Sequence, residues 1–136
     1  MTAVDTNILI YIHDPRESDK QEIASNIVTS IDDGVLLWRV ACEYIAASRK
    51  LEPLGYSWKE AWDDIHSLQL VWHTVIPSWN LISDSKEIMS GFHLSFWDAL
   101  IVSACLHSGV EKLYTEDFDA YSRIRNLEII NPFKAK

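Results

Sequence analysis

The stretch SFWDALIVSACLHSGVEKLYTED, residues 95–117, is the part of the sequence that decides the fold class. Its first half is largely apolar, begins at Ser95 and is followed by Gly109, so we predict a helix over residues 95–107. Its second half contains a run of strand length over residues 112–115. A helix that leads directly into a short strand is typical of sheets whose parallel strands are connected by helices.

Short strand-like runs alternate with helical patterns along the rest of the chain. Further strands are predicted over residues 2–4, 34–38, 74–76 and 127–130. Further helices are predicted over residues 19–30, 39–51, 57–71, 78–90 and 118–124. This alternation predicts an α/β fold with a central, mostly parallel sheet flanked by helices. Because no repeat or linker interrupts the pattern, we expect residues 1–136 to form a single domain.

The composition restricts the possible partners and location. A chain of 136 residues with 48% hydrophobic and 24% charged residues is typical of one folded domain. Its net charge of -8 argues against general attraction to nucleic-acid phosphates. No apolar run approaches the ~18 residues of a membrane span, and no secretory signal pattern is present, so we expect a cytoplasmic protein. Cys42 and Cys105 lie in apolar helical runs and are predicted to be reduced and buried.

Four acidic residues occupy positions where a carboxylate can serve chemistry, but each also has an ordinary structural explanation. Asp5 and Asp117 follow strands and suit helix N-caps. Asp98 lies in a first helical turn, where the helix dipole stabilises a carboxylate, although it shares its face with apolar residues. Glu43 shares a helical face with Lys50 and fits an exposed position.

The four acids point to a site if the fold brings them together. In open α/β sheets, active sites form beyond the carboxyl ends of the strands, and the first and fourth predicted strands each have an acid there. These acids converge if the two strands lie side by side. Packed carboxylates repel one another and remain ionised together only with a cation. An all-oxygen set without Cys or His ligands favours Mg²⁺ or Mn²⁺, which characteristically serve phosphoryl chemistry.

Four motifs, in this order, resemble those of PIN domains. They are Asp5-Thr6-Asn7 after the first strand, Glu43 on a mid-chain helix, Phe96-Trp97-Asp98-Ala99-Leu100-Ile101 at a helix start, and Leu113-Tyr114-Thr115-Glu116-Asp117 late in the chain. The resemblance spans nearly the whole chain and is strongest to the VapC-type toxins of toxin–antitoxin pairs. It implies a PIN-like three-layer α/β fold and a Mg²⁺- or Mn²⁺-dependent endoribonuclease. The implied catalytic and metal-binding residues are Asp5, Glu43, Asp98 and Asp117, supported by Asn7 and Thr115.

The same resemblance implies how the site works and what binds to it. Water activated by the metal hydrolyses an RNA phosphodiester bond and leaves a 5′-phosphate and a 3′-hydroxyl. A cognate antitoxin holds the toxin in check, and the toxin forms a homodimer. RNA binding also needs positive charge, and Arg39 and Lys50 border the helix that carries the glutamate. Arg16, Lys20 and Arg49 are further candidates, although all five also fit an ordinary exposed surface.

Three alternatives fit parts of the same pattern. A phosphatase that forms an aspartyl-phosphate normally has a second Asp two positions after the first, where this chain has Asn7. A PIN-like binding module without catalysis has the same residues, and so does an RNA-processing nuclease outside a toxin–antitoxin pair. Metal binding and RNA cleavage distinguish these alternatives.

The sequence contains six tryptophans. The apolar helical pattern predicts that four of them lie in the core: Trp38, Trp62, Trp72 and Trp97. Trp58 and Trp79 stand at helix starts and are predicted to be exposed, where aromatic side chains suit a partner or a dimer contact.

Overall fold

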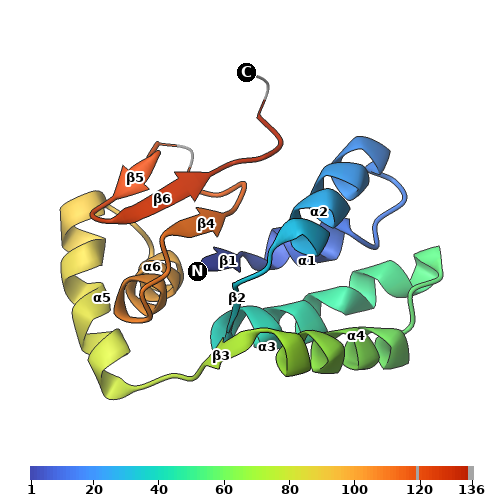
Figure 1. Ribbon diagram of the computed structural model, residues 1–136, viewed down its shortest axis with the longest axis horizontal. Coiled ribbons are helices and arrows are strands. Elements are labelled where there is room, and N and C mark those ends of the chain that lie inside the picture. Colours follow the sequence, from blue (N-terminus) through green and yellow to red (C-terminus); the bar gives the residue numbers. More distant parts are fainter. Residues whose placement is uncertain (119, 135–136) are drawn as a thin grey trace.

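The computed structural model describes residues 1–118 and 120–134. Its strands are β1 (Thr2–Val4), β2 (Gly34–Leu37), β3 (His73–Val75), β4 (Lys112–Tyr114), β5 (Arg123–Ile124) and β6 (Leu127–Ile130). They form one six-stranded sheet in the order β3-β2-β1-β4-β6-β5 (Figure 1). Every neighbouring pair is parallel except β5 and β6. The predicted, mostly parallel sheet is therefore confirmed.

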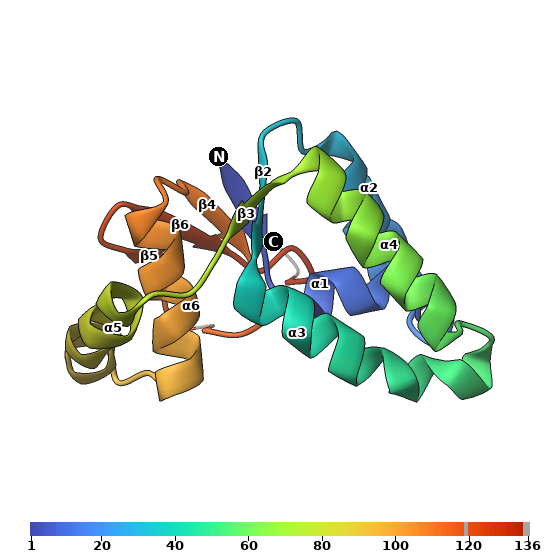
Figure 2. The same ribbon diagram turned by 90° about the horizontal axis from the view of Figure 1, so that it is seen from below.

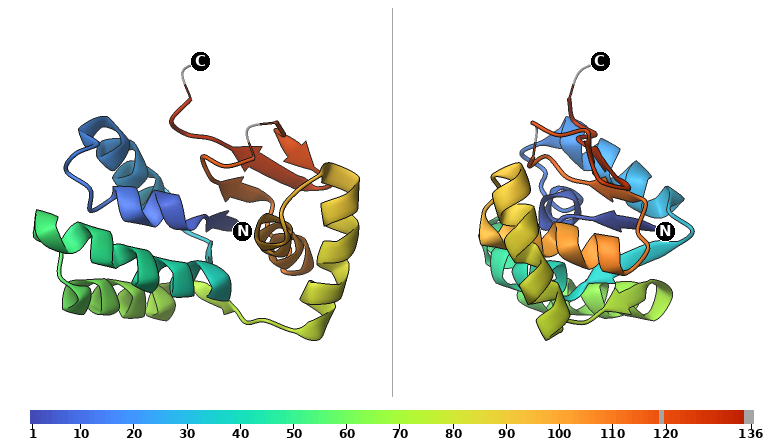
Figure 3. Two further views of the ribbon diagram at one scale, coloured as in Figure 1. Left: turned by 180° about the vertical axis from the view of Figure 1, so that it is seen from behind. Right: turned by 90° about the vertical axis from the view of Figure 1, so that its left-hand side faces the viewer.

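Helices cover both faces of this sheet. They are α1 (Thr6–Tyr11), α2 (Ser18–Ser30), α3 (Trp38–Ala47), the 3₁₀ helix η1 (Ser48–Leu54), α4 (Trp58–Val71), α5 (Trp79–Phe92) and α6 (Phe96–His107). Figures 2 and 3 show α5 and α6 together on one side of the strands, with α1, α2, α3 and α4 on the other. This is the three-layer α/β arrangement that the sequence predicts.

The strand order brings the first and fourth strands together. The strand β1 is central and pairs with β2 on one side and with β4 on the other. Val4 is in register with Tyr114, so the two strands end at the same edge of the sheet. The residues that follow them, Asp5 and Thr115, consequently meet at this carboxyl edge.

The core lies on both faces of the central strands. Ala3, Val35 and Leu113 are fully buried, as a parallel sheet between two layers of helices requires. Gly34 opens β2 against the Trp72 side chain, where a Cβ atom would come within 2.2 Å of the indole ring. Trp72 is buried, as predicted. Any residue larger than Gly34 would displace this ring from the core.

Serine residues define the starts of three helices. The side chains of Ser57, Ser78 and Ser95 each accept a hydrogen bond from the backbone N–H three positions later. These caps confirm the predicted starts of α4, α5 and α6. Trp58 and Trp79, which follow two of the caps, are exposed, as predicted.

The predicted helix over residues 118–124 is wrong. Phe118 has a positive φ of 62°, outside the right-handed helical region. The Tyr121 N–H donates to the Phe118 carbonyl at 2.8 Å in a turn, and β5 then pairs with β6 around Arg125, whose φ is 52°. Position 119 lies outside the described residues. Pairing of β5 with β6 outweighs the local helical pattern because strand formation depends strongly on the neighbouring strand.

The predicted helix over residues 39–51 begins one residue earlier and ends sooner. Its α-helical part, α3, ends at Ala47 and continues as η1, which contains Pro53. Proline cannot donate to the carbonyl of Arg49, and its ring clashes with that carbonyl in an α-helix. The helix therefore changes geometry before it reaches the proline.

Three tryptophans predicted in the core are exposed instead. The exposed fractions are 47% for Trp38, 44% for Trp62 and 54% for Trp97. Cys42, on α3, is also exposed, so its predicted burial is wrong, whereas Cys105 is buried as predicted. Apolar periodicity identifies one face of a helix, but tertiary packing decides whether another element covers that face.

The length and composition of the helices test the prediction that the chain contains no membrane span. Within the described residues, no single helix combines the length and apolarity needed to cross a membrane. Taken together, α5 and α6 meet the criteria of length and apolarity for a membrane span, but the pair is bent by 114° at the break between the two helices.

Candidate active site

Asp5 directly follows β1 and is almost completely buried, with 4% of its surface exposed. Its Oδ1 accepts a hydrogen bond from the Thr6 N–H at 2.7 Å, and its Oδ2 accepts one from the Thr115 hydroxyl at 2.8 Å. The Asp5 N–H donates to the Tyr114 carbonyl at 2.8 Å. Because these partners come from α1 and the end of β4, the parallel pairing of β1 with β4 fixes the orientation of the carboxylate.

Thr115 connects Asp5 to a second acid. Its Oγ1 donates to Asp5 and accepts a hydrogen bond from the Asp117 N–H at 3.0 Å. On the first turn of α1, the Asn7 side chain donates from Nδ2 to Asp117 Oδ2 at 3.3 Å. The structure thus brings four of the predicted site residues together: Asp5, Asn7, Thr115 and Asp117.

The electrostatic environment of Asp5 includes a third acid. The pKa of Asp5 is raised from 3.8 to about 6, and burial is the largest cause because a buried carboxylate loses its hydration. Hydrogen bonds from Thr115 and Thr6 lower the pKa in part, whereas the charges of Asp117 and Glu43 raise it further. Three acids from distant parts of the sequence therefore repel one another at this site, and a bound cation would relieve that repulsion.

Arg39 connects the glutamate to the start of α6. Its Nε lies 3.4 Å from Glu43 Oε1, one helical turn away on α3. Its guanidinium carbon lies 4.1 Å from the centroid of the Trp97 ring, and Asp98 is the next residue. Asp98 is half-buried, and it is not among the groups that shift the pKa of Asp5. The contacts of the described residues therefore connect Asp5, Asp117 and Glu43, whereas the role of Asp98 at the site stays a prediction.

The oxygen atoms at this site suit a hard divalent cation. Asn7 Oδ1 is buried and accepts no hydrogen bond from the described residues, which leaves an oxygen ligand on the amide that contacts Asp117. Within the described part of the chain, however, no three Asp, Glu, His or Cys side chains form a ready-made metal cage. Mg²⁺ usually binds through one or two carboxylates and keeps several waters. The residues present therefore fit a partly hydrated Mg²⁺ or Mn²⁺.

The structure adds contacts that the sequence does not identify. The Tyr11 hydroxyl donates to Glu116 Oε1 at 2.6 Å, and Lys20 Nζ donates to Glu116 Oε2 at 3.2 Å. The available sequence signal was the position of Glu116 directly before Asp117. Lys20, a candidate RNA contact by sequence, is instead engaged with this glutamate. Lys50, a favoured RNA contact, lies exposed on η1.

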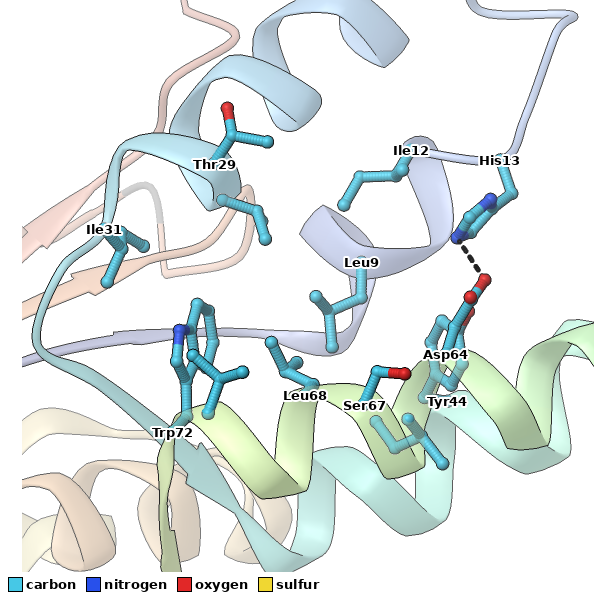
Figure 4. A pocket seen from close by; sticks show the side chains of 13 residues that line it. Leu9, Ile12, His13, Thr29, Ile31, Tyr44, Asp64, Ser67, Leu68 and Trp72 are labelled. Carbon is cyan, nitrogen blue, oxygen red and sulfur yellow. Dashed lines mark ion pairs between the residues drawn. The ribbon is translucent and has the colours of Figure 1, made fainter.

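A separate pocket lies between α1, α2 and α4 (Figure 4). It has a volume of about 360 Å³, and none of the four acids lines it. Its walls are mainly apolar, and Figure 4 shows Leu9 and Leu68 beside the cavity. At one end, His13 Nε2 lies 3.4 Å from Asp64 Oδ2. This pocket therefore combines an apolar surface with one ionisable pair.

The ionisable pair belongs to a larger polar cluster. The His13 ring stacks on Tyr56 with a centroid distance of 3.9 Å, and the Tyr56 hydroxyl donates to Asp64 Oδ2 at 2.6 Å. The hydroxyls of Tyr56 and Tyr44 also share a short hydrogen bond. Burial lowers the pKa of His13, and the charge of Asp64 offsets this effect in part.

The fold and the site together define a class: a three-layer α/β domain with a parallel sheet and acidic residues at the carboxyl edge of that sheet. The sequence matches the PIN domain family over residues 2–127. This chain belongs to the PIN domain family. The matched region contains Asp5, Glu43, Asp98 and Asp117.

Solved structures share this fold at low sequence identity. A toxin–antitoxin complex from Klebsiella pneumoniae has a TM-score of 0.74 and 15% identity, covering 99% of this chain and 100% of that chain. VapBC-1 from nontypeable Haemophilus influenzae has a TM-score of 0.66 and 17% identity, covering 98% of each chain. The sarcin-ricin loop cleaving toxin VapC20 from Mycobacterium tuberculosis has a TM-score of 0.65 and 15% identity, covering 88% of this chain and 92% of that chain. No curated protein sequence matches this chain significantly.

Proposed function

We propose that this PIN domain is a Mg²⁺- or Mn²⁺-dependent endoribonuclease. The observation that carries this proposal is the buried Asp5, linked to Asp117 by Thr115, with a pKa raised to about 6. A buried carboxylate among like charges is destabilising, and such groups cluster at functional sites. The three residues lie at the carboxyl edge of the sheet, where α/β proteins bind their ligands.

The residues of the site have distinct roles in this reaction. Asp5, Asp98 and Asp117 bind the ion, directly or through water. When bound, the ion polarises the scissile phosphate and lowers the pKa of a water molecule. Glu43 binds the ion or orients the attacking water, and Thr115 keeps two of the aspartates in place. Cleavage of the bond between phosphorus and the 3′ oxygen leaves a 5′-phosphate and a 3′-hydroxyl.

Arg39 and Trp97 provide an RNA-binding surface next to the acids. Trp97 is 54% exposed, and an exposed aromatic ring can stack with a base of single-stranded RNA. The Arg39 Nε–H is buried and makes no hydrogen bond with the described residues, because its 3.4 Å approach to Glu43 lacks hydrogen-bond geometry. Arg39 contributes positive charge beside Glu43 and Trp97, and Lys50 adds positive charge beyond the end of the same helix. The net charge of -8 favours recognition by fit over general attraction.

We further propose that the chain is the toxin of a toxin–antitoxin pair that acts in the cytoplasm. Its fold is similar to proteins from toxin–antitoxin complexes of Klebsiella pneumoniae and Haemophilus influenzae. The apolar pocket between α1, α2 and α4 offers a surface for an apolar antitoxin segment, and Asp64 at one end suits a basic side chain.

A homodimer is the proposed assembly. Exposed Trp38 on α3 and Trp62 on α4 line a second, mainly apolar cavity of about 410 Å³ on the outer face of these helices. Exposed aromatic residues in a contiguous apolar patch are typical of protein interfaces. The oligomeric state of Trp62→Ser in solution tests this contact.

Cleavage of RNA by the purified full-length chain tests the proposed chemistry. We expect cleavage with Mg²⁺ or Mn²⁺, products with 5′-phosphates, and no cleavage when EDTA removes the ion. Asp98→Asn should lower the rate by about a hundredfold or more, as loss of one electrostatic group at a reacting centre commonly does. Asp63→Asn is the matched control because this exposed acid on α4 makes the same change in charge away from the site. Equal cleavage by wild type and Asp98→Asn would contradict the proposed role of Asp98.

A PIN-like binding module without catalysis is the second candidate. The lack of a ready-made three-ligand cage among the described residues favours it. Such a module would bind Mn²⁺ weakly and leave RNA intact. A toxin is distinguished from an RNA-processing enzyme by expression in cells: a toxin arrests growth, and Asp98→Asn relieves the arrest.

A further inference from the structure

Glu116 is engaged on both carboxylate oxygens by residues outside the metal site. Its Oε1 accepts from the Tyr11 hydroxyl at 2.6 Å, and its Oε2 accepts from Lys20 Nζ at 3.2 Å. Lys20 Nζ also donates to the Tyr11 hydroxyl at 3.2 Å, which closes a three-membered polar cluster. The three residues come from α1, α2 and the loop after β4.

Two aromatic side chains, Tyr11 and Phe133, lie against this cluster. The rings of Tyr11 and Phe133 meet edge to face at a centroid distance of 5.1 Å. Lys20 Nζ lies 4.8 Å from the Tyr11 ring centroid and 5.4 Å from that of Phe133. Aromatic faces stabilise a nearby ammonium group, so they favour one position of the lysine. The segment after β6 is thereby packed against the same cluster as α1 and α2.

The loop that carries Asp117 needs such an anchor. The strand β4 ends at Tyr114, and the Thr115 N–H, which donates to the Ile130 carbonyl, extends the hydrogen bonding between β4 and β6 by one residue. Phe118 directly follows Asp117 and has a φ of 62°, a conformation that non-glycine residues adopt at a free-energy cost. Strained backbone persists only where surrounding contacts determine its conformation.

We propose that Glu116, clamped by Tyr11 and Lys20, is a positioning residue that holds Asp117 at the metal site. This inference rests on the proposed function, because it assigns Asp117 to metal binding. Asn7 and Thr115 position Asp117 from one side through two hydrogen bonds, and the Glu116 clamp fixes the backbone beside it. The role differs from that of a metal ligand because both Glu116 oxygens are already hydrogen-bonded.

Mn²⁺ binding by the full-length chain, measured by calorimetry without RNA, tests the clamp. Lys20→Met keeps most of the apolar stem and removes the charge, and it should weaken Mn²⁺ binding by about tenfold, as loss of a residue that orients a ligand commonly does. Lys20→Arg preserves an ion pair with Glu116 and should recover most of the affinity. Glu116→Gln should weaken binding to a similar degree. Lys59→Met is the matched control, because it makes the same substitution at an exposed lysine on α4, away from Glu116.

Each outcome supports or overturns the clamp. Thermal unfolding of every variant is measured in parallel, and if Glu116→Gln is unfolded, the test rests on the Lys20→Met and Lys20→Arg pair, whose site is partly exposed. Unchanged Mn²⁺ affinity in folded Lys20→Met overturns the clamp and leaves the metal site intact. If a separate RNA-binding measurement on the same variant shows weaker binding while its Mn²⁺ affinity is unchanged, Lys20 is a substrate contact and the clamp is overturned. Equal Mn²⁺ binding by wild type and Asp5→Asn overturns the proposed metal site itself, and the clamp with it.

Discussion

The two ends of α1 carry a buried acid and a half-buried base, which the fold treats in opposite ways. Asp5 precedes the helix and belongs to the acidic site, whereas His13 follows it and lines the apolar pocket. Burial raises the pKa of Asp5 and lowers the pKa of His13. One physical cause, the loss of hydration, disfavours the charged form of both groups. At neutral pH the acid is nevertheless charged, whereas the base is neutral.

The surroundings of the two groups explain why only one of them suits a metal ion. Asp5 is surrounded by the like charges of Asp117 and Glu43, which raise its pKa further. His13 stacks on Tyr56 and faces Asp64, whose charge would stabilise its protonated form. A cluster of like charges needs a counter-ion, and a pair of potentially opposite charges does not. This difference is the physical basis for proposing a cation at one end of α1 only.

The largest expected effect is on the stability of the metal-free protein. A pKa raised from 3.8 to about 6 corresponds to about 3 kcal/mol at pH 7, so Asp5→Asn should increase the free energy of unfolding by up to that amount. The reason is that Asn carries no buried charge and keeps one oxygen to accept from the Thr6 N–H. Its Nδ2 cannot accept from the Thr115 hydroxyl, and the loss of this hydrogen bond limits the gain. Urea unfolding in EDTA measures the change. A large loss of stability in this variant would show that the Asp5 charge stabilises the fold.

The second prediction concerns the pH dependence of metal stabilisation. Between pH 3.8 and about 6 the folded chain holds more protons at Asp5 than the unfolded chain, so metal-free stability falls as the pH rises through this window. Mg²⁺ competes with the proton for the same oxygens. We therefore expect Mg²⁺ to raise the unfolding temperature by about 5 °C at about pH 7.5 and by under about 2 °C at about pH 5. Asp5→Asn should abolish the difference, and equal shifts at both pH values would argue against binding at Asp5.

The third prediction tests whether the hydrogen bonds of Tyr56 beside the pocket stabilise the protein when no ligand is bound. Tyr56→Phe removes a hydroxyl that makes two hydrogen bonds, with Asp64 and with Tyr44, and should lower the free energy of unfolding by about 2 kcal/mol, at about 1 kcal/mol for each bond. The ring and its stacking on His13 remain. Ser67→Ala, at an exposed position on α4, is the control and should change stability by less than about 0.5 kcal/mol. If both variants behave alike, the tyrosine hydroxyl does not stabilise the fold.

The smallest expected effect is the pH dependence that His13 contributes. Because its pKa is lowered in the folded state, the unfolded chain binds the proton first as the pH falls below about 6.5. Its contribution to stability is therefore complete above that pH and is lost as the pH falls through the folded-state pKa. In the Asp5→Asn background, the urea midpoint should fall from pH 7 to pH 5, and adding His13→Phe should reduce this slope. If the urea midpoint depends on pH equally with and without His13→Phe, the pH dependence comes from another group.

Local signals were sufficient for most helices and strands. Ser57, Ser78 and Ser95 cap helices in the structure as their sequence context predicts, because an N-cap depends only on the residues next to it. The exposure of Trp97 was not predictable, because an apolar helical face carries no information about what covers it. In place of the predicted helix over residues 118–124, β5 pairs with β6. This pairing depends on residues beyond 124, which the local pattern does not include.

The candidate site was predictable in part. The residue types and motif order indicated Asp5, Glu43, Asp98 and Asp117, and an all-oxygen set indicated the class of ion. The Glu116 clamp was not predictable, since Lys20 is 96 residues away from its partner in the sequence. Such contacts require the distant segments to be folded against each other.

The sequence alone determined the alternation of strands and helices and the acids that follow them, because propensity, capping and apolar periodicity act over a few residues. Only the tertiary structure decided that β1 lies beside β4, and hence that Thr115 bridges Asp5 and Asp117. It also decided that burial and neighbouring charge together raise the pKa of Asp5, since both depend on groups far apart along the chain. The chemistry of each acid is a property of its residue type, whereas its electrostatic environment is a property of the fold.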